Sequence, residues 1–150
     1  MTAVSIMNPN PTVLKPTDRI NTAAGYIMEH RCRNLPVVDE EGCYLGIFGV
    51  NCLLRLVLPK AALLKDGLKS VPFIHESLSD LHDHLREVEN EPITRCMSND
   101  AVTVPPDNPL IDTLLTLYRT KTLIPVVEPD TCKLLGTISY WDAGQHILSA

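Results

Sequence analysis

The stretch that decides the fold is Leu35-Pro36-Val37-Val38, followed after a turn by Gly46-Ile47-Phe48. The same order returns as Ile124-Pro125-Val126-Val127, followed by Gly136-Thr137-Ile138. Pro125 lies 89 positions after Pro36, and Gly136 lies 90 positions after Gly46. A unit repeated in this way is too small to bury its own apolar face, so the two copies are expected to pack against each other. The site worth searching for therefore lies between the copies.

Apolar spacing around these stretches predicts the same element order, β-α-β-β-α, in both copies. The first copy has an opening strand at 12–14, a helix at 20–28, strands at 35–39 and 44–48, and a helix at 50–58. The second has strands at 101–104, 123–128 and 133–139, with helices ending near 119 and spanning 140–148. The uninterrupted apolar strands indicate burial on both faces. We therefore predict an α/β (α+β) fold of two repeats, at 1–58 and 93–150, joined by a connector at 59–92.

The C-terminal half of the connector accounts for the net negative charge of the chain. The formal net charge is -5, and residues 76–91 contain six acidic residues against Arg86 alone. Leu78, Leu81, Leu85 and Val88 form a narrow apolar stripe, which predicts a helix lying on the module with its charges in water. His82 and His84 sit among these acids, and two interpretations remain open: a solvated helix face, which we favour, or a pH-sensitive or basic-partner-binding segment. The helical spacing does not favour a metal site.

Composition excludes several classes of protein. Aromatic residues make up only 5% of the chain, which argues against a stacking platform for nucleic acid. No stretch is apolar enough to predict a membrane span. The five cysteines are odd in number and scattered, so we expect neither a disulfide framework nor a metal or redox motif, and a reducing cytoplasm fits best. No nucleophile with a recognisable base and no phosphate-binding loop is present, so we expect no enzyme.

The ordered set of motifs, occurring twice, closely resembles the cystathionine β-synthase (CBS) domain, and the pair resembles the tandem CBS arrangement called a Bateman module. The resemblance covers about residues 6–58 and 96–148. It implies a pseudo-twofold α/β module whose cleft binds adenosine-containing ligands such as AMP, ADP, ATP or S-adenosylmethionine. It also implies that the module regulates another protein and needs no cofactor beyond that regulatory ligand.

The ligand signature of the resembled family is complete in the second repeat, from Gly136 to Asp142. A helix N-terminus there presents free N–H groups to a phosphate, the Ser139 hydroxyl adds a donor, and the Asp142 carboxylate can accept from both ribose hydroxyls. Ser139 and Asp142 also fit a capping box that only satisfies backbone amides. Both roles stay open. The first repeat has Gly49 and Cys52 at the corresponding places, so we expect one site per chain.

The resemblance implies that adenine lies against the opening strand and the residues leading into the second Pro-Val-Val. The alternative is that these positions are core. The complete predicted ligand-binding set is Ala101, Val102, Thr103, Thr122, Leu123, Ile124, Pro125, Ser139, Trp141 and Asp142. The basic residues before each Pro-Val-Val could reach phosphates or offset helix dipoles; they are His30, Arg31, Arg33, Arg119 and Lys121.

We therefore expect a cytoplasmic, regulatory, ligand-sensing module that binds an adenine nucleotide and acts in trans on an effector protein of unknown identity. A homodimer is expected, because the helices at 50–58 and 140–148 carry more apolar surface than one small module covers. The alternative is a constitutive dimerisation or scaffold module that senses no ligand.

Overall fold

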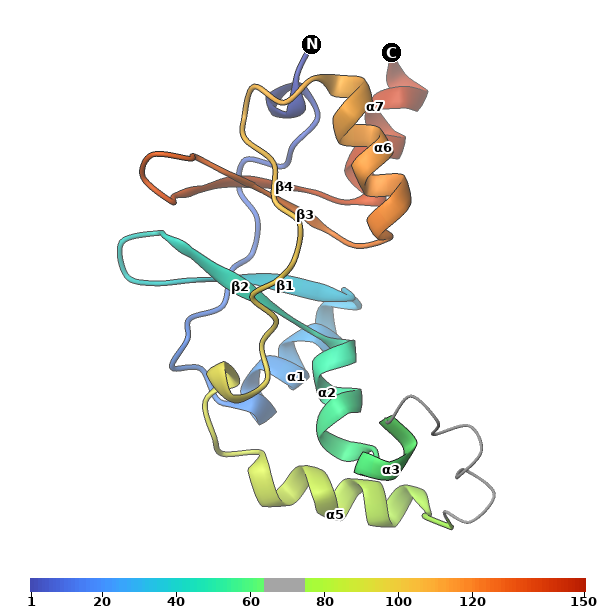
Figure 1. Cartoon of the computed structure of the whole chain (residues 1–150). Coiled ribbons are helices and arrows are strands. Elements are labelled where there is room, and N and C mark those ends of the chain that lie inside the picture. The colour runs from blue at the N-terminus through green and yellow to red at the C-terminus, as the bar shows by residue number, and fades with distance from the viewer. Residues whose placement is uncertain (64–74) are drawn as a thin grey trace.

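Two antiparallel hairpins stack at the centre of the molecule (Figure 1). The computed structural model describes residues 1–63 and 75–150. In the first hairpin β1 (Asn34–Val38) pairs with β2 (Tyr44–Gly49), and in the second β3 (Ile124–Val127) pairs with β4 (Leu134–Ile138). Both hairpin turns point to the same side of the molecule. The predicted fold of two repeats with mixed helix and strand is confirmed.

Each hairpin is covered by its own pair of helices at opposite ends of the molecule (Figure 1). The first pair is α1 (Ile20–His30) and α2 (Val50–Val57), and the second is α6 (Leu110–Thr120) and α7 (Tyr140–Ser149). Most of the buried apolar residues accordingly form two clusters. The first contains Leu14, Ile20, Ala23, Ile27, Leu35, Val37, Phe48, Cys52 and Ile93; the second contains Ala3, Ile6, Val104, Leu117, Ile124, Val126, Ile138 and Ala143.

The two sequence repeats exchange the segments that precede them. The short helix η1 (Ala3–Ser5) packs into the second core, and η3 (Ile93–Arg95) packs into the first. Asn8 pairs with Thr137 of β4, with N–H···O distances of 2.8 and 3.1 Å, and Ser98 pairs in the same way with Ile47 of β2, at 2.8 and 2.7 Å. Each repeat therefore completes its core with the segment that precedes the other repeat in sequence.

Two glycines of the repeated pattern permit this crossing. A Cβ at Gly136 would lie 2.5 Å from the Asn8 carbonyl oxygen, and a Cβ at Gly46 would lie 2.5 Å from the Ser98 carbonyl oxygen. Both distances are well below normal contact, so only glycine admits the crossing backbone at these positions. The glycine that opens the ligand signature thus serves the packing of the repeats.

The opening strands are shorter than predicted. Instead of strands at 12–14 and 101–104, the structure has one parallel bridge in each repeat, Leu14 to Val37 and Val104 to Val126. A proline follows each within two residues, at Pro16 and Pro105. Because proline has no N–H to donate, the ladder ends there.

The connector places one long helix, α5 (Leu78–Val88), against α2 (Figure 1). The described part of the connector also contains α3 (Lys60–Leu63), while residues 64–74 of the predicted connector lie outside the described residues. Leu85 and Val88 pack against the first core as predicted, whereas Leu78 is 85% exposed. The apolar stripe is therefore only partly buried.

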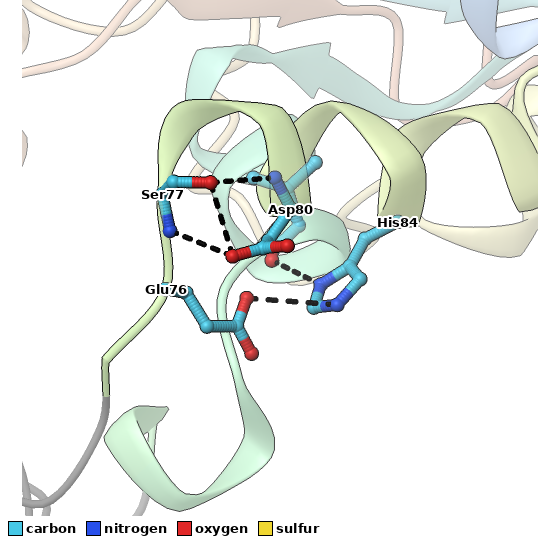
Figure 2. A network of polar contacts seen from close by, with 5 residues as sticks. Glu76, Ser77, Asp80 and His84 are labelled. Atoms are coloured by element: carbon cyan, nitrogen blue, oxygen red, sulfur yellow. Dashed lines mark hydrogen bonds and ion pairs between the residues drawn. The ribbon is translucent and has the colours of Figure 1, made fainter.

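A polar network caps the start of α5 and, through His84, joins this helix to the end of α2 (Figure 2). Ser77 and Asp80 form a capping box: the Asp80 N–H donates to Ser77 Oγ at 3.2 Å, and the Ser77 N–H donates to Asp80 Oδ2 at 2.9 Å. His84 Nδ1 lies 2.8 Å from the Val57 carbonyl oxygen, and His84 Nε2 lies 3.5 Å from Glu76 Oε2. The hydrogen bond to Val57, then the carboxylates of Glu76, Glu87 and Asp80, raise the pKa of His84.

The prediction about disulfides is wrong. Cys43 and Cys132, 89 positions apart, form a disulfide between the turns of the two hairpins, with their Cα atoms 5.0 Å apart. Spacing along the chain suggested isolated thiols, but the two cysteines occupy equivalent places in the repeats, and the pseudo-twofold arrangement brings these places together. Cys32, Cys52 and Cys96 are free thiols.

Candidate functional site

A cleft of about 380 Å³ lies between the repeats, at the ends of the hairpins away from their turns. Such a volume is within the usual range for small-molecule sites. The cleft is bounded by the start of β1 in the first repeat and by the end of β4 and the start of α7 in the second. Its lining consists of Asn8, Pro11, Thr12, Tyr26, His30, Arg31, Cys32, Arg33, Asn34, Leu35, Pro36, Lys121, Thr122, Leu123, Thr137, Ser139, Tyr140, Trp141 and Asp142.

Ser139 and Asp142 meet at the N-terminus of α7, where they form a capping box. The Ser139 N–H and hydroxyl both donate to Asp142 Oδ2 at 2.8 Å, and the Asp142 N–H donates to Ser139 Oγ at 3.2 Å. The cap interpretation of the signature is therefore confirmed. Among the hydrogen bonds of the described residues, those of the Asp142 carboxylate all use Oδ2, which leaves the acceptor capacity of Oδ1 for another partner. Both residues also line the cleft, so the same side-chain positions allow them to cap α7 and to contact a ligand.

The cleft is rich in positive charge. Arg31, Arg33 and Lys121 line it, and Asp142 is the one carboxylate among the described lining residues. Arg31 and Lys121 hold equivalent places, since each is the left-handed C-cap residue of the helix that leads into its hairpin, with φ of 51° and 56°. Arg33 reaches across the repeats, with its Nη1 3.4 Å from the Lys121 carbonyl oxygen. Cations from both repeats thus face one space.

One further hydrogen bond crosses between the repeats at the cleft. Asn34 Nδ2 donates to Thr122 Oγ1 at 2.7 Å. Asn34 begins β1 and Thr122 precedes β3, so this contact and that of Arg33 fix the spacing of the two hairpins where the cleft opens. A ligand in the cleft would therefore touch both repeats.

The structure places half of the predicted ligand-binding residues in the cleft. Thr122, Leu123, Ser139, Trp141 and Asp142 line it. The remaining five lie outside its lining: Ala101, Val102, Thr103, Ile124 and Pro125. Ile124 and Pro125 are fully buried, as the alternative interpretation expected, and Ile124 belongs to the second core, while Val102 and Thr103 are exposed. Contact of any of the ten with a ligand stays a prediction.

The crossing of the opening segments explains this division. Because Asn8 pairs with β4, the segment that reaches the second-repeat signature is Pro11 and Thr12 of the first repeat. Ser98, which precedes Ala101, instead pairs with β2, beside the first-repeat signature. Sequence reasoning assigned each opening strand to its own repeat, and the Leu14–Val37 and Val104–Val126 bridges agree with this, but it missed Pro11, Thr12 and Asn34 as lining residues. The 90-residue offset was the available signal, since it relates Thr12 to Val102.

In the first repeat, Gly49 and Cys52 stand where the second repeat has Ser139 and Asp142, and neighbouring atoms leave no room there for larger side chains. A Cβ at Gly49 would collide with the Arg33 carbonyl oxygen and lie 2.6 Å from Asn34 Cβ, and Cys52 is only 3% exposed. Arg55 Nη2 lies 3.5 Å from Cys52 Sγ and donates to the Cys96 carbonyl oxygen at 3.1 Å. No equivalent of the Ser139 and Asp142 pair exists there.

Comparison with known proteins identifies the family. The sequence pattern of the CBS domain matches residues 3–59 and 88–148 of the chain. The chain belongs to the CBS domain family. The match covers both repeats, so the protein holds a CBS pair, and the resemblance seen in the sequence is confirmed. Across residues 1–63 and 75–150, no group of three His, Cys, Asp or Glu side chains is placed to hold a metal ion.

Solved CBS structures share the fold along nearly the whole chain. A putative acetoin utilization protein (AcuB) from Vibrio cholerae has a TM-score of 0.73 at 20% identity, covering 99% of this chain and 91% of that one. CBSX2 in complex with AMP has a TM-score of 0.71 at 22% identity, covering 99% and 96%. The CBS domain pair of MJ0100, in complex with 5-methylthioadenosine and S-adenosyl-L-methionine, has a TM-score of 0.63 at 18% identity, covering 98% and 99%.

A curated relative contains a similar segment within a much longer protein. The A-adding tRNA nucleotidyltransferase of Aquifex aeolicus (strain VF5) is 29% identical over 144 residues, which are 95% of this chain but 14% of that enzyme. The chain therefore spans only a small part of this relative. In the described residues, no helix has the length and apolar character needed to cross a bilayer.

Proposed function

We propose that this CBS pair is a regulatory module, not an enzyme, that binds one adenine nucleotide in the cleft between its repeats. The observation that carries the proposal is the meeting of Ser139 and Asp142 with Arg31, Arg33 and Lys121 around one cleft. The carboxylate supplies an acceptor for ribose hydroxyls, and the cations supply donors for phosphate oxygens. Fold relatives that hold AMP or S-adenosyl-L-methionine support an adenosine-containing ligand.

The charge of the cleft favours a ligand with phosphate groups. Three cations against one carboxylate attract a phosphate, and guanidinium groups match phosphate oxygens in pairs. S-adenosylmethionine carries a positive sulfonium, which the same cations repel. Among the adenosine-containing ligands that the family resemblance implies, AMP, ADP and ATP are therefore preferred.

Regulation would follow from linkage. A ligand that contacts both repeats binds one arrangement of the hairpins better than others and shifts the population toward it. An effector protein that binds better to this arrangement would then bind more tightly when nucleotide is present. The effector would in turn raise the affinity for nucleotide by the same factor. In the alternative, a scaffold without sensing, Arg31 and Lys121 would only offset the dipoles of the helices that they cap.

A homodimer is the expected assembly. The helices of the second repeat leave large apolar side chains in water: Ile111, Leu115 and Tyr118 on α6, and Trp141, Ile147 and Leu148 on α7. In the first repeat α5 packs along α2 and covers part of the corresponding surface. An apolar face of this kind marks an interaction surface, and a second copy offers an identical one.

The test is calorimetry and thermal shift with AMP, ADP, ATP and S-adenosylmethionine. A ligand at concentration c that binds only the folded state stabilises it by RT ln(1 + c/Kd), so the melting temperature rises as the logarithm of ligand concentration above Kd. We expect stabilisation by at least one nucleotide, a stoichiometry of one per chain, and weaker binding at higher salt, because the phosphate contacts are ionic. No response to any of the four ligands would favour the scaffold alternative.

A cytoplasmic location stays a prediction, and it has lost part of its support. It rested on scattered free thiols, whereas Cys43 and Cys132 are joined in the structure. The effector protein is unknown.

A further inference from the structure

The Cys43–Cys132 disulfide connects equivalent points of the two repeats. Cys43 lies in the turn between β1 and β2, and Cys132 in the turn between β3 and β4. Two backbone hydrogen bonds join the same turns: the Tyr44 N–H donates to the Cys132 carbonyl at 2.8 Å, and the Leu134 N–H donates to the Gly42 carbonyl at 3.0 Å. The disulfide thus adds a covalent link between two turns that these backbone hydrogen bonds already join.

The disulfide and the cleft lie at opposite ends of the same strands. β1 begins at Asn34, which lines the cleft, and runs toward the turn that holds Cys43. β4 leaves the turn that holds Cys132 and ends at Ile138, just before Ser139 in the cleft. Strands of this length span roughly 15 Å. The strands therefore join the turns that hold the disulfide to the lining of the cleft.

The disulfide is accessible to reagents at Cys132, whereas Cys52 is buried and Cys32 and Cys96 are half-buried. Cys132 is exposed and Cys43 is partly exposed. Burial raises the pKa of the Cys32 thiol, and burial together with the neighbouring Cys52 raises the pKa of Cys96 to about 11. Thiolate attack on an accessible disulfide is the route by which such bonds open. The exposed sulfur of Cys132 therefore makes the turn a point at which a thiolate can attack.

We propose that the Cys43–Cys132 bond is a reducible clamp between the two CBS repeats that sets the affinity of the cleft for its ligand. The second half of this statement rests on the proposed function. A dithiol reductant supplies two electrons and two protons: the Cys43–Cys132 bond breaks, two protein thiols form, and the reagent closes to its own disulfide. The reduced protein samples more hairpin spacings, so nucleotide binding must then order the repeats as well as fill the cleft.

The experiment compares oxidised and dithiothreitol-reduced protein, with Cys43→Ser/Cys132→Ser treated in parallel. Alkylation before and after reduction, read by peptide mass spectrometry, reports the state of Cys43 and Cys132. We expect reduction to lower the melting temperature by about 5 to 15 °C, because the bond closes a loop of nearly 90 residues. We expect the nucleotide Kd to rise about fivefold or more, the lower end of ordinary coupling between sites. The double variant should have the melting temperature and nucleotide Kd of the reduced protein, and dithiothreitol should change neither.

Three results would overturn the clamp. Alkylation of both cysteines without reductant would show that the bond is absent, equal melting temperatures would show that it constrains nothing, and equal nucleotide Kd values would show that the cleft does not respond. If neither form binds any nucleotide, the proposed function and the coupling to the cleft both fail. The melting temperatures would still decide, on their own, whether the bond holds the repeats together.

Discussion

At the scale of single residues, Ser139 and Asp142 show how one motif serves structure and ligand together. The capping box uses Asp142 Oδ2, and the same carboxylate lines the cleft. The chain contains an independent copy of the box at Ser77 and Asp80, which caps α5 away from the cleft (Figure 2). The two boxes therefore allow the cap and the ligand contact to be measured separately.

Asp142→Ala is expected to weaken nucleotide binding by about 2 to 4 kcal/mol, the cost of removing a charged acceptor from a ligand contact. It should also lower the free energy of unfolding by about 1 kcal/mol through loss of the cap. Calorimetry measures the first effect and denaturant unfolding the second. Asp80→Ala is the matched control and should show only the loss of stability. Undiminished affinity in the Asp142 variant would remove this residue from the site.

Repeat one should not regain a site when its signature is restored. In Gly49→Ser/Cys52→Asp, the new Cβ at position 49 meets the Arg33 carbonyl, and a carboxylate replaces a buried thiol. We expect the free energy of unfolding to fall by about 2 to 5 kcal/mol and the stoichiometry to stay at one. Calorimetry with the best-binding nucleotide, together with urea unfolding, checks both. A second ligand per chain would contradict the filled geometry of this repeat.

At the scale of elements, the contact between α5 and α2 depends on pH through His84. Its pKa is raised by the hydrogen bond to the Val57 carbonyl and by nearby carboxylates, with Glu76 first among them. A raised pKa means that the charged form is favoured in the folded protein. The stabilisation is therefore complete below the unfolded-state pKa of about 6.5 and is lost as pH rises through the higher folded-state pKa.

We therefore expect amide exchange in α5, corrected for the intrinsic effect of pH, to be slower at mildly acidic pH than above pH 8. His84→Gln should remove this pH dependence. His82→Gln, on the exposed outer face of the same helix, is the control and should retain it. NMR titration of the His84 ring measures the pKa directly. A titration midpoint at or below about 6.5 would contradict the assignment of the network.

At the scale of the whole molecule, the uncovered apolar side chains on α7 predict a homodimer. Ile147→Asp/Leu148→Asp places two charges on side chains that are 64% and 89% exposed in the single chain, so the fold should tolerate them. We expect the variant to be monomeric at concentrations where the unmodified protein is dimeric, because burying an unpaired charge in an interface is costly. Light scattering coupled to size-exclusion chromatography gives the masses.

Leu78→Asp is the control for this change, because Leu78 is equally exposed but lies on α5. It should leave the mass unchanged. A monomeric unmodified protein at high micromolar concentration would remove the dimer from the proposal.

The sequence by itself determined the repeat, the hairpins and the helices that flank them. Local patterns carried these predictions: the Pro-Val-Val stretches are apolar throughout, and the apolar spacing of α1 and α6 is helical. The Ser139 and Asp142 cap was also predictable, because a capping box is a contact within one turn of chain. Each of these features depends on neighbours in sequence.

Only the tertiary structure decided how the two repeats combine. The exchange of opening segments brought Pro11 and Thr12 to the signature of the other repeat and left Ala101, Val102 and Thr103 outside the cleft. The pseudo-twofold packing of the hairpins placed Cys43 against Cys132, although each looks isolated in sequence. Local propensity could not specify these contacts, because they join residues far apart in sequence: Asn8 and Thr137 are 129 positions apart, and Cys43 and Cys132 are 89. Their proximity follows from the pseudo-twofold packing of two cores, each of which buries a segment that precedes the other repeat.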